Sequence, residues 1–206
     1  MRRTFFLSCN KKSLPLSLII TRRIMFKEIV LKIVRIITAP EDSWSKLSAS
    51  ESYQAFINRY LHPIFGVISL TSFIGGLWII QDGNIESALK SAIINLVTVY
   101  GGYYIGSYIL NEYLPRLGIA KDESKVQQFV GYSSALMYAL FIVTPFFPSF
   151  IILRLFALYT IYIVYTGYGV YIVGEEENRM HFTGVATTLI LLTPVLIMGI
   201  LSILIK

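Results

Sequence analysis

Five long apolar segments, separated by short polar breaks, constrain this chain more than any other feature. A helix needs about 20 mostly apolar residues to cross the hydrocarbon core of a bilayer. The breaks between the segments contain Gly, Pro, Asn or charged residues, which are typical of connections. Strands of alternating hydrophobicity are absent. The sequence therefore predicts an all-α integral membrane protein with a bundle of five transmembrane helices, at about 64–80, 92–110, 129–147, 150–173 and 183–205.

The charge balance supports a membrane protein and suggests its orientation. Only 15% of the residues are charged, against about 25% in soluble domains. Residues 1–59 carry a net charge of +7 and the remainder carries −1. Since cytoplasmic flanks collect Lys and Arg, an N-terminus inside and a C-terminus outside places 15 of the 18 basic residues in the cytoplasm. We therefore predict a multi-pass protein of the cell inner (plasma) membrane, with the lipid bilayer and not nucleic acid as its partner.

The region before the first span divides at Met25. Residues 1–24 are interpreted as a basic tail, disordered by composition, or as an extension upstream of a start at Met25. Residues 25–60 are predicted to form short amphipathic helices at the cytoplasmic face, and residues 61–206 the membrane domain. In 26–37, the polar residues Lys27, Glu28, Lys32 and Arg35 gather on one side of a helix. The apolar side then lies in the membrane interface or packs on the protein's own helices, and both interpretations stay open.

A second short helix is expected to begin at Pro40. Proline suits the first turn of a helix, and Glu41 and Asp42 favour its positive end. Trp44 is interpreted either as an interfacial anchor or as a buried plug between short helices.

The spans offer little chemistry. All 12 Asp and Glu residues lie outside them, and His62 and His181 have no metal-binding spacing. The single cysteine excludes a disulfide framework. We expect no catalytic residue, metal or cofactor, and therefore no enzyme. The candidate intramembrane polar or packing residues are Asn95, Gly102, Gly106 and Arg154. Gly102 and Gly106 have the spacing that lets helices approach closely, and Arg154 is near enough to a span end to reach the surface.

Tyrosines occur at every third position from Tyr159 to Tyr171. Three residues advance an α-helix by about 300°, so this spacing does not form a stripe. Tyr159 and Tyr168 should point in opposite directions, and the hydroxyl groups should have separate partners. Tyr168 and Tyr171, near the cytoplasmic end, suit the aromatic belt at the headgroups.

The sequence IVRIITAPEDSWSKL, then SYQAFINRYLHPIFGVISL, then the apolar segments with LYTIYIVYTGYGVYIVG near the end, resembles the Yip-one (Ypt-interacting protein) membrane-domain family, in its bacterial branch. The resemblance covers about residues 25–205. Pro40 and Trp44 match the motif that precedes the first span, and Tyr162, Tyr165 and Gly167 match the motif in the fourth. It implies a five-span, non-enzymatic membrane protein. Eukaryotic members bind Rab-type GTPases, but this chain lacks their long acidic, proline-rich segment.

Two functions stay open. The first is a non-enzymatic protein that binds or organises partner proteins or lipids at the membrane, with a membrane or cytoplasmic protein or a second copy of the chain as partner. The second is a transporter or channel for a small neutral or anionic solute, lined by Asn95, the glycines at 101, 102 and 106, the fourth-span tyrosines and Arg154.

Overall fold

The computed structural model describes the backbone of residues 16–47, 52–78, 84–147 and 155–205, and the side chains of these segments from Phe26 onward. Every regular element within these residues is a helix. The chain forms α1 (Leu16–Thr38), α2 (Pro40–Leu47), α3 (Tyr53–Phe56), a π-helix (Ile57–Leu61), α4 (His62–Trp78), α5 (Ile85–Tyr113), a 3₁₀-helix (Leu114–Leu117), α6 (Glu123–Ser133), α7 (Ala135–Val143), 3₁₀-helices (Thr144–Phe146 and Phe156–Tyr159), α9 (Thr160–Gly167), a second π-helix (Tyr168–Ile172), a 3₁₀-helix (Glu176–Asn178) and α10 (Arg179–Leu204).

Three continuous helices are long and apolar enough to cross a bilayer, at Tyr53–Trp78, Ile85–Leu117 and Glu176–Leu204. A fourth candidate is the pair Glu123–Ser133 and Ala135–Phe146, which is bent by 45° between its halves. The apolar helix Phe156–Ile172 is shorter than these. The structure thus confirms an all-α protein with three or four candidate spans, while the predicted count of five stays a prediction.

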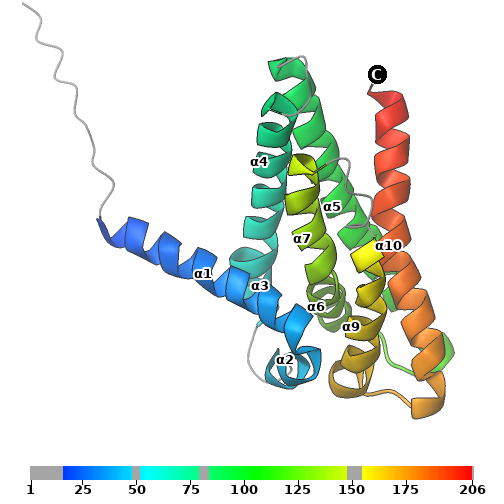
Figure 1. The fold of residues 1–206 in the computed structure, drawn as a ribbon. Helices are drawn as coiled ribbons and strands as arrows, with labels where there is room; N and C mark the ends of the chain where they lie inside the picture. Colours follow the sequence, from blue (N-terminus) through cyan, green and yellow to red (C-terminus); the bar gives the residue numbers. More distant parts are fainter. Residues whose placement is uncertain (1–15, 48–51, 79–83, 148–154, 206) are drawn as a thin grey trace, which may run out of the picture.

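The long helices α4, α5 and α10 and the shorter α7 run along one common direction (Figure 1). The helix α5 packs against α4 and against α10. Gly76 allows α4 to approach α5 closely, because a β-carbon added to it would lie 2.8 Å from Ala88 Cα. Gly75 likewise allows α4 to approach the 3₁₀-helix Thr144–Phe146, because a β-carbon added to it would lie 2.6 Å from Pro145 Cβ. Local signals set the helix ends: Asn84 and Asp122 accept hydrogen bonds from the backbone of Glu86 and Lys125, as N-cap residues do.

The helices α1 and α2 lie at one end of this bundle, and the C-terminal end of α10 lies at the other (Figure 1). The helix α2 begins at Pro40, as the sequence predicts. The helix α1 begins at Leu16, well before Met25. Residues 16–24, which the sequence assigns to the tail or upstream extension, thus belong to the same helix as the following amphipathic segment. Residues 1–15 lie outside the described part of the chain, and the division at Met25 stays a prediction.

Candidate functional site

Trp44 joins α2 to the bundle. Its side chain is fully buried, and the indole Nε1 donates a hydrogen bond to the backbone carbonyl of Ile163 in α9 at 3.0 Å. The indole stacks on Phe129 with ring centroids 5.1 Å apart, and it also contacts Tyr171 at 5.4 Å. A buried indole with its N–H satisfied combines large apolar burial with a directional bond. Trp44 is therefore buried, and its interpretation as an interfacial anchor is wrong. The buried plug lies between α2 and the bundle and not, as expected, between the two short helices.

Gly167 provides the space for this indole. A β-carbon at Gly167 would lie 2.5 Å from Trp44 Cε2 and 2.8 Å from Phe129 Cε2. Both rings belong to fully buried side chains, so neither has room to move away. The glycine is thus required by the packing of α2 on α9.

The other residues that carry the Yip-one resemblance lie nearby. Pro40 is buried at the start of α2. The Tyr162 hydroxyl contacts Glu41 Oε1 at 3.4 Å, which links α9 to the first turn of α2. Tyr165 faces α10 instead, where the Arg179 guanidinium lies 3.8 Å from the centre of its ring and Arg179 Nε donates to the Tyr165 carbonyl. The structure therefore brings Trp44, Tyr162 and Gly167 together at the contact between α2 and α9.

Three tyrosines of the fourth apolar segment, Tyr162, Tyr168 and Tyr171, have separate partners for their hydroxyl groups, as predicted. Tyr168 donates to the Glu175 carbonyl at 2.8 Å, and Tyr171 donates to Gln128 Oε1 at 2.6 Å. Tyr159 is 38% exposed whereas Tyr168 is fully buried. Their assignment to an aromatic belt is wrong for Tyr168 and Tyr171, because both side chains are buried in the bundle next to Phe182 and Phe129.

Sequence reasoning missed two glutamines that take part in this packing. Gln128 accepts the hydrogen bond from Tyr171, and Gln127 accepts one from Tyr53 and donates to Glu123 at 2.9 Å. Both glutamines are buried. Two adjacent amides at the start of an apolar segment are a signal that could have found them, since buried amides need partners.

The surface of α1 has three parts. Ile29, Ile33 and Ile36 are buried against the protein, whereas Phe26, Val30 and Val34 are exposed. Lys27, Glu28 and Arg35 are exposed on the polar side. Lys32 lies over the rings of Tyr60 and Tyr132, with its Nζ 5.7 and 5.4 Å from the ring centres. Packing on the protein's own helices thus explains the burial of the three isoleucines, but it does not cover the other apolar residues, Phe26, Val30 and Val34.

The candidate intramembrane residues do not form one site. Gly102 and Gly106 both face α10, because a β-carbon added to Gly102 would lie 2.6 Å from Pro194 Cγ and one added to Gly106 would lie 3.8 Å from the Leu189 carbonyl oxygen. This is the close helix approach that their spacing predicts. The Asn95 amide donates to the Ser91 carbonyl within its own helix at 3.0 Å. Arg154 lies outside the described residues.

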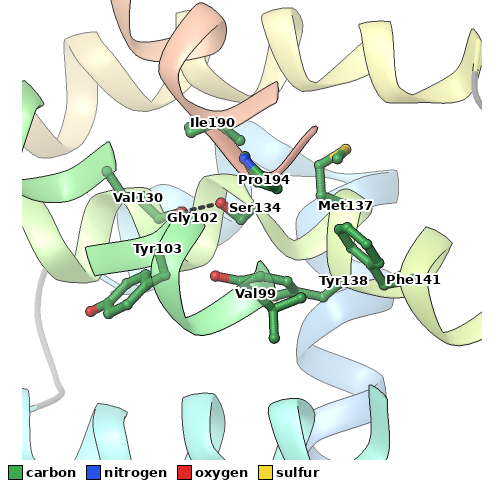
Figure 2. A pocket seen from close by; sticks show the side chains of 10 residues that line it. All are labelled: Val99, Gly102, Tyr103, Val130, Ser134, Met137, Tyr138, Phe141, Ile190 and Pro194. Atoms are coloured by element: carbon green, nitrogen blue, oxygen red, sulfur yellow. Dashed lines mark hydrogen bonds between the residues drawn. The ribbon is translucent and has the colours of Figure 1, made fainter. Parts of the chain in front are cut away.

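A small internal cavity lies beside the bend between α6 and α7 (Figure 2). Tyr103, Ser134, Tyr138 and Pro194 are among the residues that line it, and the volume open to the centre of a water molecule is about 10 Å³. That is room for about one water. The Ser134 hydroxyl donates to the Val130 carbonyl at 2.7 Å (Figure 2). The buried hydroxyls of Tyr103 and Tyr138 have no hydrogen-bond partner among the described residues.

No group of three or more metal-ligating side chains occurs within the described residues. No family model matches the chain, and no curated protein or solved structure matches it either. The resemblance to the Yip-one family therefore stays a prediction that rests on the residues named above.

Proposed function

We propose that this chain is a non-enzymatic multi-pass protein of the inner membrane, of the Yip-one type, which binds or organises partner proteins or lipids through a platform formed by α1 and α2. The observation that carries the proposal is the burial of Trp44 between α2 and the bundle, with its bond to Ile163. This anchor gives the charged surface of α2 a fixed position relative to the bundle. A fixed surface favours binding because less conformational entropy is lost on association.

In this proposal the end of the bundle with α1 and α2 faces the cytoplasm, and the C-terminus lies outside. Among the described Lys and Arg residues, only Lys90 lies near the opposite end, where α5 begins. This distribution supports the orientation, because basic residues collect on the cytoplasmic side. In this proposal the helix Phe156–Ile172 is the fifth span, since about 17 apolar residues are the lower limit for crossing.

Affinity capture of the full chain from native membranes after mild crosslinking tests the proposal. Asp42 and Lys46 are exposed on α2, away from the buried face of Trp44. We expect a reproducible partner that is lost in the double variant Asp42→Lys/Lys46→Glu. The matched control, Glu86→Lys/Lys90→Glu, reverses an exposed pair at the other end of the bundle and should keep the partner. An identical set of captured proteins in both variants would contradict the proposal.

A transporter or channel for a small neutral or anionic solute is the alternative. The observation that favours it is the cavity between the bend at Ser134 and the proline within α10, since interrupted helices form the binding sites of many transporters. Saturable flux into liposomes that contain the purified protein would support this alternative. Asn95 does not line this cavity, so the matching variant is Ser134→Ala, which removes a polar group of the cavity wall and should reduce the flux while the protein stays folded.

A further inference from the structure

The exposed apolar side of α1 has no partner within the described protein. Val30 is 57% exposed, Val34 47% and Phe26 43%. At about 100° per residue these three side chains share an arc of about 80°, next to the buried arc of Ile29, Ile33 and Ile36. The apolar surface of α1 is thus wider than its contact with the bundle requires.

Basic residues accompany this apolar arc. The helix α1 contains Arg22, Arg23, Lys27, Lys32 and Arg35 against a single acidic residue, Glu28. Lys27 is exposed and falls beside Val34 at the edge of the arc. A long side chain in that place can lay its methylene groups on apolar material and keep its charge in the headgroup region.

The direction of α1 fits a surface and not a span. It runs obliquely to α4, α5 and α10, with its C-terminal end beside α2 and its N-terminal half projecting to the side of the bundle (Figure 1). If the bundle crosses the bilayer as proposed above, α1 lies near the plane of the headgroups. There one flank of its apolar side meets the protein and the other flank meets the acyl chains.

We propose that α1 is a docking surface for anionic phospholipids of the cytoplasmic leaflet, with Phe26, Val30 and Val34 inserted among the acyl chains and Lys27 and Arg35 bound to the headgroup phosphates. This inference rests on the proposed function and names the partner of α1. Apolar insertion combined with attraction to anionic lipids is the binding mode of interfacial amphipathic helices. Protein partners would then bind the polar surface of α2.

Spin labels on the full chain test the insertion. The single native cysteine is changed by Cys9→Ser, and one cysteine at a time is introduced by Val30→Cys, Val34→Cys or Glu28→Cys. Each labelled protein is reconstituted in phosphatidylcholine vesicles with roughly one-third phosphatidylglycerol. We expect labels at 30 and 34 to collide more with oxygen than with a water-soluble nickel chelate, and the label at 28 to show the reverse. Equal nickel access at all three positions would overturn the insertion.

Headgroup preference needs a second measurement. A fluorophore at position 30 should be quenched more by spin-labelled phosphatidylglycerol than by spin-labelled phosphatidylcholine. We expect this difference to fall at least to half in Lys27→Gln/Arg35→Gln and to persist in Lys121→Gln/Lys125→Gln, which removes the same charge at the same end of the bundle. A preference that is absent from the unsubstituted protein, or unchanged by Lys27→Gln/Arg35→Gln, would overturn the anionic assignment.

The two proposals fail in different ways. Nickel access at positions 30 and 34, combined with a protein partner that depends on α2, would overturn lipid docking and leave the proposed platform in place. Lipid insertion without any captured partner would support lipid docking and contradict a role in recruiting proteins.

Discussion

At the scale of single residues, the neighbours of Gly167 leave no room for a side chain at this position. Gly167→Ala places a methyl group against the rings of Trp44 and Phe129, at 2.5 and 2.8 Å. Overpacking of this kind costs about 1–3 kcal/mol. We expect the midpoint of unfolding in detergent to fall accordingly. Gly184→Ala is the control, because its β-carbon meets nothing within 4 Å, and equal stability of the two variants would contradict the packing role of Gly167.

The buried tyrosines allow a second prediction, because one hydroxyl has a partner and another has none among the described residues. Tyr171 donates to Gln128 at 2.6 Å, so Tyr171→Phe leaves a buried amide oxygen unpaired and should cost about 1–3 kcal/mol. The Tyr103 hydroxyl is buried without such a partner, so Tyr103→Phe should be neutral or slightly stabilising. Equilibrium unfolding in the same detergent checks both. A similar loss in both variants would instead indicate a water in the cavity that binds the Tyr103 hydroxyl.

The sequence predicts which residues belong to the site, but it does not predict which residues they contact. Motifs point to Trp44 and Gly167, but their contact joins positions far apart in the chain, so periodicity alone does not reveal it. Tyr171 meets Gln128 because the second π-helix packs on α6, whereas Tyr168 donates to the Glu175 carbonyl, which follows it closely in the chain. The spacing excludes a stripe, but it carries no information on which neighbour each hydroxyl meets.

At the scale of elements, the attachment of α2 depends on Trp44. Trp44→Ala removes the stacking on Phe129 and the bond to Ile163, and such truncations cost about 3–5 kcal/mol. We expect α1 and α2 to exchange backbone hydrogens much faster while α5 stays protected, measured by hydrogen exchange with mass spectrometry. Trp78→Ala is the control, since Trp78 is 83% exposed. Equal protection of α1 and α2 in both variants would contradict the anchor.

The apolar pattern of the sequence predicts where the long helices α4 and α10 lie, but it does not predict the bend between α6 and α7 or the start of α1. The segments expected at 64–80 and 183–205 correspond to α4 and α10, because length and hydropathy determine them directly. The apolar pattern does not predict the 45° bend within the segment at 129–147. The bend depends on local geometry at Ser134, whose hydroxyl bonds back to Val130, a pattern known to bend helices. The pattern also misses the early start of α1 at Leu16.

At the scale of the whole molecule, the two ends of the bundle differ in the number of charged residues that they carry. One end carries α1, α2 and most of the described charged residues, including the pairs Lys121–Glu112 and Arg179–Glu176. The other end carries the pair Lys90–Glu86. In the proposed function, α1 and α2 must face the cytoplasm. The number of spans determines which side of the membrane each loop faces, so the span count tests the proposed orientation.

The helix Phe156–Ile172 decides that number, because it is the shortest of the candidates. If it crosses the bilayer, Phe147 and Glu177 lie on opposite sides of the membrane; if it does not, they lie on the same side. In a Cys9→Ser background, we expect Phe147→Cys to react with an impermeant maleimide on intact cells, and Glu177→Cys to react only after permeabilisation. Lys121→Cys, at the same end of the bundle as Glu177, should behave like Glu177→Cys. Labelling of Phe147→Cys and Glu177→Cys from the same side would reduce the chain to four spans and place the start and end of α10 differently from the orientation proposed here.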